Sequence, residues 1–163
     1  TEEDGRGRDW LVAQMRSLGL DVRIDRVGNI VGLLAGQEEG PAVVLGSHID
    51  TVSTGGRFDG ALGVVGGLEV IATLRDHGLT PRHPLAVIAF TNEEGIRFHP
   101  DMLGSYVWSG GMSVAAAQAE RDAEGAVFGE ELRRIGYEGP EEPGFLPARA
   151  QAGIETHRHA VAG

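Results

Sequence analysis

The sequence predicts an α/β domain in which helices flank a mixed, largely parallel sheet. Two observations lead to this fold class. The runs "AVVLGSH" and "PLAVIAF" have the short, aliphatic and β-branched character of buried strands. Stretches with apolar residues at helical spacing precede and separate them, so helices and strands alternate along the chain.

The first element is an amphipathic helix over residues 7–18. Leu11, Met15 and Leu18 recur at positions i, i+4 and i+7, and Gly19 is a typical helix stop. "DVRID" then alternates apolar and polar residues, as a strand does. "VGNIVGLLAG" follows after a Gly28–Asn29 turn, so we expect a hairpin.

The second half of the predicted sheet consists of the two apolar runs and the helix between them. We expect the strand in "AVVLGSH" to be buried on both faces. The spacing over residues 60–77 predicts a helix that ends at Gly78. Its apolar face would be formed by Leu62, Val65, Leu68 and either Ile71 or Ala72. "PLAVIAF" repeats the signature of a buried strand.

The sequence of the last third of the chain predicts two short helices followed by a loop. "MSVAAAQAERDA" and "GEELRRIG" are typical of two helices separated by Gly125, and "YEGPEEPGFLPARA" of a loop. We therefore divide the chain into a folded part, residues 1–139, and a linker with a tail, residues 140–163.

Composition restricts the partners. The net charge of −10 would repel a phosphate backbone, so we expect no nucleic acid partner. The chain has no cysteine, which excludes disulfides and thiolate metal ligands and is compatible with the cytoplasm. No apolar run approaches the length of a membrane helix, so we expect no membrane partner.

Polar residues that can bind a metal follow both apolar runs. His48, Asp50 and Asp59 come after the first run, and Glu93 and Glu94 after the second. If the two strands are neighbours, these side chains meet at the carboxyl ends of the strands. Four carboxylates so close together would repel one another, and a bound divalent cation is the simplest way to hold them.

The residue types suit hydrolysis. In the His-x-Asp pattern, His48 can bind a metal while Asp50 accepts the second ring N–H. Asp59 has two oxygens and can bridge two ions. Because Glu93 and Glu94 are adjacent, one can bind metal while the other acts as a general base on water. Taken singly, each pattern is more typical of a solvated turn, and Asp59 could simply cap a helix; their joint occurrence favours the site.

Two motifs resemble a known family. "GSHIDTVSTGGRFDGALGVVGGLEV" and "FTNEEGIRF", together with "DMLGSYVWSGG", are similar to the amidase branch of the dinuclear zinc peptidase-like superfamily. That branch includes N-carbamoyl-L-amino acid hydrolases and allantoate amidohydrolases. The short step of eleven positions from His48 to Asp59 favours this branch over the aminoacylases and dipeptidases.

The resemblance implies a function and roles for the residues. The reaction would be hydrolysis of linear amide or ureido C–N bonds in a small-molecule substrate, by water activated between two divalent ions. These would be Zn²⁺ first, with Mn²⁺, Co²⁺ or Ni²⁺ as alternatives. His48 and Glu94 would each bind one ion and Asp59 both, while Asp50 would support His48 and Glu93 would be the general base.

The match weakens towards the end of the chain. Family members carry a further histidine ligand in a segment that resembles "ELHIEQG", where this sequence has "ETHRHAVAG". His157 keeps the Glu-x-His step and is the first candidate, with His159 as its competitor. The family's lid and dimerisation domain has no counterpart here, so residues 1–139 would be the N-terminal part of the catalytic domain. The full-length form is expected to be a homodimer, and the 163 residues alone to bind metal weakly and turn over slowly.

Two other functions remain open. One is an aminoacylase or peptidase of the same superfamily, which a substrate panel would separate. The other is a non-catalytic remnant that binds metal or a partner subunit. Metal content discriminates here, because two ions per chain would indicate an enzyme, one an incomplete site and none the remnant.

Overall fold

The computed structural model describes residues 1–146 of the chain. Its centre is a four-stranded sheet with the strand order β1-β2-β4-β3. The strands are β1 (Asp21–Ile24), β2 (Ile30–Leu34), β3 (Val43–His48) and β4 (Leu85–Phe90). The predicted hairpin of β1 and β2 is present, and its register pairs Ile24 with Ile30.

The sheet is mixed, as predicted, but its parallel share is smaller than expected. Within residues 1–146, β1–β2 and β2–β4 are antiparallel, and β3–β4 alone is a parallel strand pair. The predicted fold class, a mixed sheet flanked by helices, is confirmed, but parallel pairing does not predominate among the described strands. The reason is that the β1–β2 hairpin adds to β4 in the reverse direction.

The prediction that β3 is buried on both faces is also wrong. β3 pairs with β4 alone and lies at an edge of the described sheet. Five of its six residues are half-buried, and His48 at its end is buried. β4, in contrast, lies between two strands and is mostly buried, as predicted.

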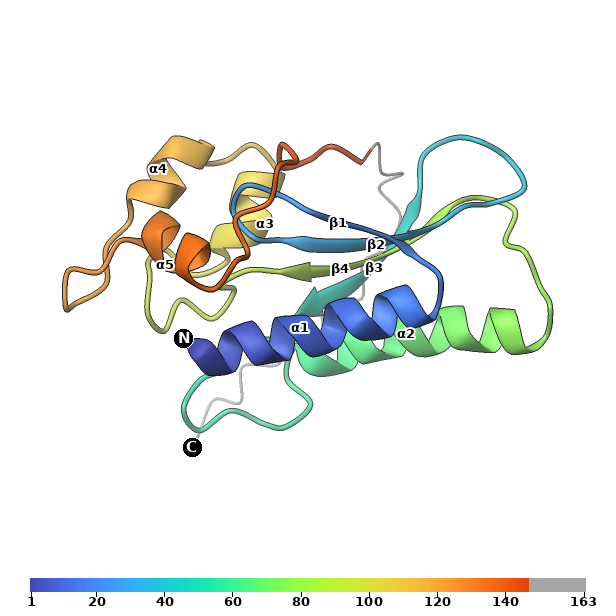
Figure 1. Cartoon of the computed structure of the whole chain (residues 1–163), viewed down its shortest axis with the longest axis horizontal. Helices are drawn as coiled ribbons and strands as arrows, with labels where there is room; N and C mark the ends of the chain where they lie inside the picture. Colours follow the sequence, from blue (N-terminus) through green and yellow to red (C-terminus); the bar gives the residue numbers. More distant parts are fainter. Residues whose placement is uncertain (147–163) are drawn as a thin grey trace, which may run out of the picture.

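Helices pack on this sheet and gather at its end. They are α1 (Glu2–Ser17), α2 (Ala61–Asp76), α3 (Leu103–Trp108), α4 (Val114–Ala119) and α5 (Phe128–Arg134). In Figure 1, α1 and α2 both run beneath the sheet, whereas α3, α4 and α5 gather beyond the tip of β4. No helix within residues 1–146 is long and apolar enough to cross a membrane.

The two long helices differ from the sequence prediction in two respects, namely the residue at which α1 begins and the face that α2 buries. α1 begins at Glu2, earlier than predicted, because the Thr1 hydroxyl accepts the Asp4 N–H at 3.2 Å and caps the helix. α2 buries Val64, Leu68 and Ile71, but Leu62 is 55% exposed. Val65, also predicted on the buried face, is 46% exposed.

The close approach of α2 to the sheet explains which of its faces is buried. A Cβ added at Gly67 would meet the side chains of Val87 and Leu45 at 3.1–3.3 Å, so the glycine lies directly on the sheet. The helix is therefore rotated towards the Val64–Gly67–Ile71 side.

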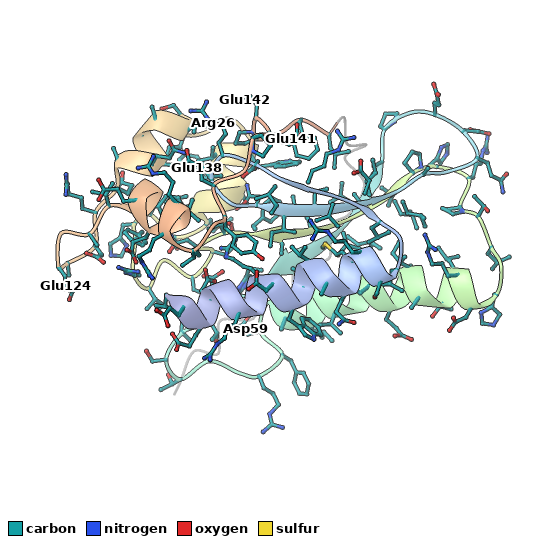
Figure 2. The ribbon with its side chains drawn as sticks, in the orientation of Figure 1. Arg26, Asp59, Glu124, Glu138, Glu141 and Glu142 are labelled. Atoms are coloured by element: carbon teal, nitrogen blue, oxygen red, sulfur yellow. The ribbon has the colours of Figure 1, made fainter. Side chains whose placement is uncertain are left out.

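Apolar residues cover both faces of the sheet. One cluster joins the sheet to α1 and α2, includes Leu11, Met15 and Val87, and extends to buried residues of α3, α4 and α5. The other lies on the opposite face, where Ile88 belongs to a cluster covered by Trp108 of α3. The segment after α5 returns along β1, where the Arg26 guanidinium and Glu142 pair at 2.8 Å (Figure 2).

Candidate metal centre

The predicted site residues lie at one edge of the sheet because β3 and β4 are parallel neighbours. His48, the last residue of β3, pairs with Phe90, the last residue of β4. The loops that follow both strands therefore start side by side, as ligand-binding loops do in open α/β sheets. The condition on which the predicted site depended, that the two strands are neighbours, is therefore met.

Three of the predicted residues form one group of potential ligands. One ligand atom each from His48, Asp59 and Glu94 lies within 4.8 Å of the other two. His48 Nε2 is 3.9 Å from Glu94 Oε1. His48 is buried, while Asp59 and Glu94 are half-buried. One imidazole and two carboxylates fit Zn²⁺ and related divalent ions.

The loop after β3 delivers Asp59 to the histidine. Gly60 has φ +65°, and a Cβ at this position would collide with the imidazole of His48. Only glycine fits this conformation and this close approach without strain. Figure 2 shows Asp59 below the start of α1, at the opposite side of the fold from the Arg26–Glu142 pair.

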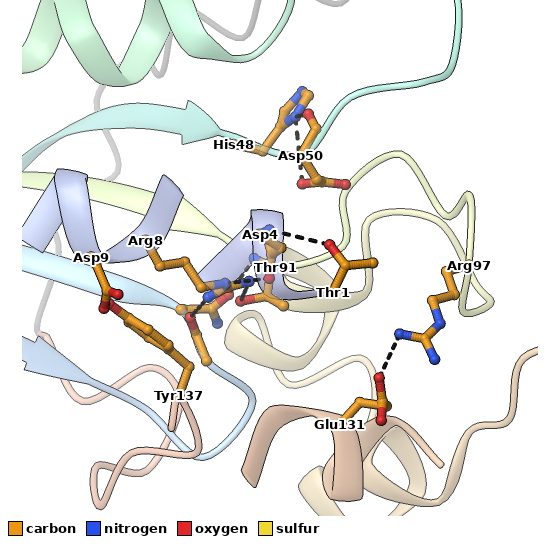
Figure 3. A network of polar contacts seen from close by, with 12 residues as sticks. Thr1, Asp4, Arg8, Asp9, His48, Asp50, Thr91, Arg97, Glu131 and Tyr137 are labelled. Atoms are coloured by element: carbon orange, nitrogen blue, oxygen red, sulfur yellow. Dashed lines mark hydrogen bonds and ion pairs between the residues drawn. The ribbon is translucent and has the colours of Figure 1, made fainter. Parts of the chain in front are cut away.

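Asp50 contacts both loops, although not in the way the sequence suggested. The His48 Nδ1 atom lies 2.8 Å from the backbone carbonyl oxygen of Asp50 and 3.6 Å from its carboxylate (Figure 3). A ring nitrogen that donates to a carbonyl leaves Nε2 facing the Glu94 side with its lone pair. The Asp50 carboxylate instead accepts the backbone N–H groups of Glu93 at 3.3 Å and Glu94 at 3.0 Å.

Glu93 is anchored by α3, which sequence reasoning missed as a helix. The Ser105 N–H donates to Glu93 Oε1 at 2.9 Å, and the Ser105 hydroxyl donates to Oε2 at 2.8 Å. Burial raises the pKa of the Glu93 carboxyl, the bonds from Ser105 oppose this rise, and the Asp50 charge adds to it. A carboxylate with a raised pKa is better suited to take a proton near neutral pH.

Glu93 and Glu94 point to different partners, as expected from the sequence, although they lie in a bend and not in extended chain. Glu94 faces His48, and Glu93 faces Ser105. The turn that separates them from β4 begins at Asn92, which has φ +55° and donates its side-chain amide to the Phe98 carbonyl at 2.8 Å. Asparagine is among the residues that tolerate this conformation.

Ser105 could have been found from the sequence only through the "DMLGSYVWSGG" segment, since it is not part of the His48–Asp59 or Glu93–Glu94 spacing.

Arg97, which lies in the "FTNEEGIRF" motif, pairs with Asp122 at 2.8 Å and with Glu131 at 2.7 Å. It therefore fastens α5 to the loop after β4 (Figure 3). His157 and His159 lie outside the described residues.

A cavity of about 550 Å³ lies beside the site. It is lined by α1, α2, α5 and the loops after β3 and β4, and its lining includes Asp50, Val64 and Ile96. His48, Asp59 and Glu94 do not line it. We therefore do not place a substrate in this cavity.

Comparison with known proteins gives a consistent picture. The model of peptidase family M28 matches residues 29–134. An N-carbamoyl-L-amino-acid amidohydrolase of Rhizobium meliloti is 43% identical over 145 residues, which are 88% of this chain and 35% of the relative. A ureidoglycolate hydrolase of Oryza sativa subsp. japonica is 39% identical, over 84% of this chain and 29% of the relative.

A solved structure agrees with the fold. The amidase of the hydantoinase/carbamoylase family from Burkholderia multivorans has a TM-score of 0.88 and 44% sequence identity. The match covers 91% of this chain and 36% of that structure. This chain thus spans about a third of the length of the relatives it matches.

Proposed function

Because the chain belongs to peptidase family M28, we infer that it carries the metal centre of a hydrolase that cleaves linear C–N bonds of amides and ureido compounds. The observation that carries this proposal is the His48–Asp59–Glu94 group next to the buried Glu93 carboxylate. The similarity to N-carbamoyl-L-amino-acid amidohydrolase and ureidoglycolate hydrolase supports the substrate class.

The side chains divide the work. His48, Asp59 and Glu94 hold divalent metal, with His157 as a further ligand. The bound metal supplies Lewis-acid activation of water and of the substrate carbonyl. Glu93 takes a proton from the attacking water and passes it to the departing nitrogen, so the C–N bond is replaced by a C–O bond. Asp50 keeps the Glu93–Glu94 backbone in place.

Several finer expectations belong to the same proposal. The centre holds two ions, of which Zn²⁺ is the first choice, and N-carbamoyl-L-amino acids or allantoate are the substrates. The full-length form is a cytoplasmic homodimer. These statements rest on the resemblance and on the donor types in the site.

A substrate panel with a matched variant tests the proposal. The chain is stripped of metal, reloaded with Zn²⁺ or Mn²⁺, and assayed on N-carbamoyl-L-amino acids, allantoate, N-acetyl amino acids and dipeptides. We expect slow ammonia release from the ureido substrates and none after Glu93→Gln, a variant that keeps all three ligands. A preference for dipeptides would favour a peptidase, and unchanged turnover by Glu93→Gln would overturn the role of Glu93.

A further inference from the structure

A fully buried pair, Asp25 and Asn29, lies behind the site and takes no part in the chemistry described so far. Both side chains are completely shielded from solvent in the turn between β1 and β2. Asn29 Nδ2 donates to Asp25 Oδ2 at 2.8 Å. Asp25 Oδ1 accepts the backbone N–H groups of Val27 and Asn29 at 3.0 and 2.9 Å.

The remaining hydrogen bonds of Asn29 leave the turn and join two distant segments. Its Oδ1 accepts the Thr91 N–H at 2.9 Å, directly after β4. Its second Nδ2 hydrogen goes to the Gly104 carbonyl at 3.1 Å, in the first turn of α3. Thr91 and Gly104 are also bonded to each other, since the Gly104 N–H donates to the Thr91 carbonyl at 2.9 Å.

One of these segments contains Glu93, and the other contains Ser105, which binds the Glu93 carboxylate. Thr91 stands two residues before Glu93, and Gly104 stands directly before Ser105. Ser105 in turn donates two hydrogen bonds to the Glu93 carboxylate, one from its backbone N–H and one from its hydroxyl. The Asn29 side chain thus fixes the spacing between the residue to be positioned and the residue that holds it.

Close packing and a second clamp reinforce this arrangement. A Cβ at Gly104 would collide with Asn29 Oδ1 and with the Thr91 backbone, so α3 reaches this distance only with glycine. Arg8 of α1 donates to the Gly28 carbonyl at 2.7 Å and to the Thr91 hydroxyl at 3.3 Å (Figure 3). Arg8 and Asn29 therefore each connect the β1–β2 turn to Thr91, the residue that follows β4.

Burying Asp25 and Asn29 costs more folding free energy than a turn of apolar residues would. Burying a carboxylate and an amide costs free energy unless every polar atom is bonded, and an apolar pair would avoid that cost. Burial raises the pKa of Asp25 to about 6, against the opposing bond from the Asn29 side chain. A turn alone does not need such a pair, whereas a precise link between β4 and α3 does.

We propose that Asn29 is a positioning residue for the Glu93 carboxylate, acting through Thr91 and Gly104. This inference rests on the proposed function only in giving Glu93 a chemical role. The geometric part, that Asn29 maintains the Ser105–Glu93 bond, stands apart from turnover and can be measured without it.

The test uses the 163-residue chain and a swapped pair. Asn29→Asp removes the Nδ2 donors but keeps the acceptor for Thr91, and it places two carboxylates together. The double variant Asp25→Asn with Asn29→Asp restores a donor and an acceptor between positions 25 and 29. It cannot restore the donation to Gly104, because an aspartate at position 29 has no N–H. If Asn29 acts only within the turn, the double variant should behave like the wild type. If Asn29 positions Glu93 through Gly104, the double variant should remain defective.

Amide hydrogen exchange of Ser105 provides the readout. Ser105 lies in the first turn of α3, where backbone N–H groups have no partner within the helix, and its N–H donates to Glu93 Oε1. In the swapped variant we expect Ser105 exchange to be at least about 10-fold faster, while Val87 in β4 keeps its protection. We also expect kcat to fall by about 10²-fold with KM unchanged, as for a misplaced base.

The unmodified chain offers a second measurement that needs no variant to fold. If Asn29 joins the two segments, the Thr91 and Ser105 amides open together and share one free energy of exchange as denaturant is added. Independent exchange of these two amides, or wild-type Ser105 exchange in the swapped variant, overturns the proposal. Unchanged turnover by Glu93→Gln would instead refute the role of Glu93 and leave the exchange result standing.

Discussion

Replacing Gly60 by alanine tests how the backbone builds the metal centre. Gly60 separates Asp59 from α2, and its φ of +65° is strained for any residue with a Cβ. That strain costs about 1–3 kcal/mol of folding free energy. The new methyl group would also collide with the His48 imidazole, which has to leave its place beside Asp50 and Glu94.

Gly66→Ala is the matched control. Gly66 lies within α2, and a Cβ added there meets no atom within 4 Å. Alanine is the better helix former, so this variant is expected to gain about 0.5–1 kcal/mol. The same chemical change, six residues apart, should therefore move stability in opposite directions.

Two assays read out the pair of variants. Urea unfolding is expected to separate Gly60→Ala from Gly66→Ala by about 1.5–4 kcal/mol. Calorimetric titration with Zn²⁺ should show weaker binding by Gly60→Ala and unchanged binding by Gly66→Ala. If Gly60→Ala is as stable as Gly66→Ala and binds Zn²⁺ equally well, the described packing of Gly60 on His48 is refuted.

Three further predictions concern stability and the Glu93 anchor. Hydrogen bonds from Arg134 and Arg97 lower the pKa of Glu131 to about 2. The ionised Glu131 therefore stabilises the fold above pH 4.5, and this contribution is lost as the pH falls towards 2. Glu131→Gln should flatten the pH dependence of the free energy of unfolding between these two pH values. Ile71→Ala should cost about 2–5 kcal/mol in urea unfolding, whereas Leu62→Ala should cost less than about 0.5 kcal/mol because that side chain is largely exposed. Ser105→Ala removes a bond that lowers the pKa of Glu93, so an NMR titration should find this pKa still higher, and a lower value would contradict the anchor.

Much of the fold could be predicted from local patterns. The β1–β2 hairpin, both strands of the site and the two long helices follow from apolar periodicity and glycine stops. The strand order does not, because periodicity carries no information on which strands pair. The two apolar runs look alike in sequence, yet β4 is central and β3 is an edge strand of the described sheet.

The candidate site shows the same division. The sequence placed His48, Asp59 and Glu94 after two apolar runs, so that they would meet if those runs formed neighbouring parallel strands, and the structure supplies that pairing. The contacts that support them could not be predicted. Ser105 belongs to a helix too short to give a clear periodic signal, and Asn29 looks like an ordinary turn residue. Their roles depend on tertiary contacts with segments far away in the sequence.

Anomalous diffraction at the zinc edge tests the central claim most directly. Crystals of the chain grown with Zn²⁺ should show a peak bounded by His48 Nε2 and by carboxylate oxygens of Asp59 and Glu94, at about 2.0–2.2 Å. No such peak, or one that does not touch these three side chains, would contradict the account.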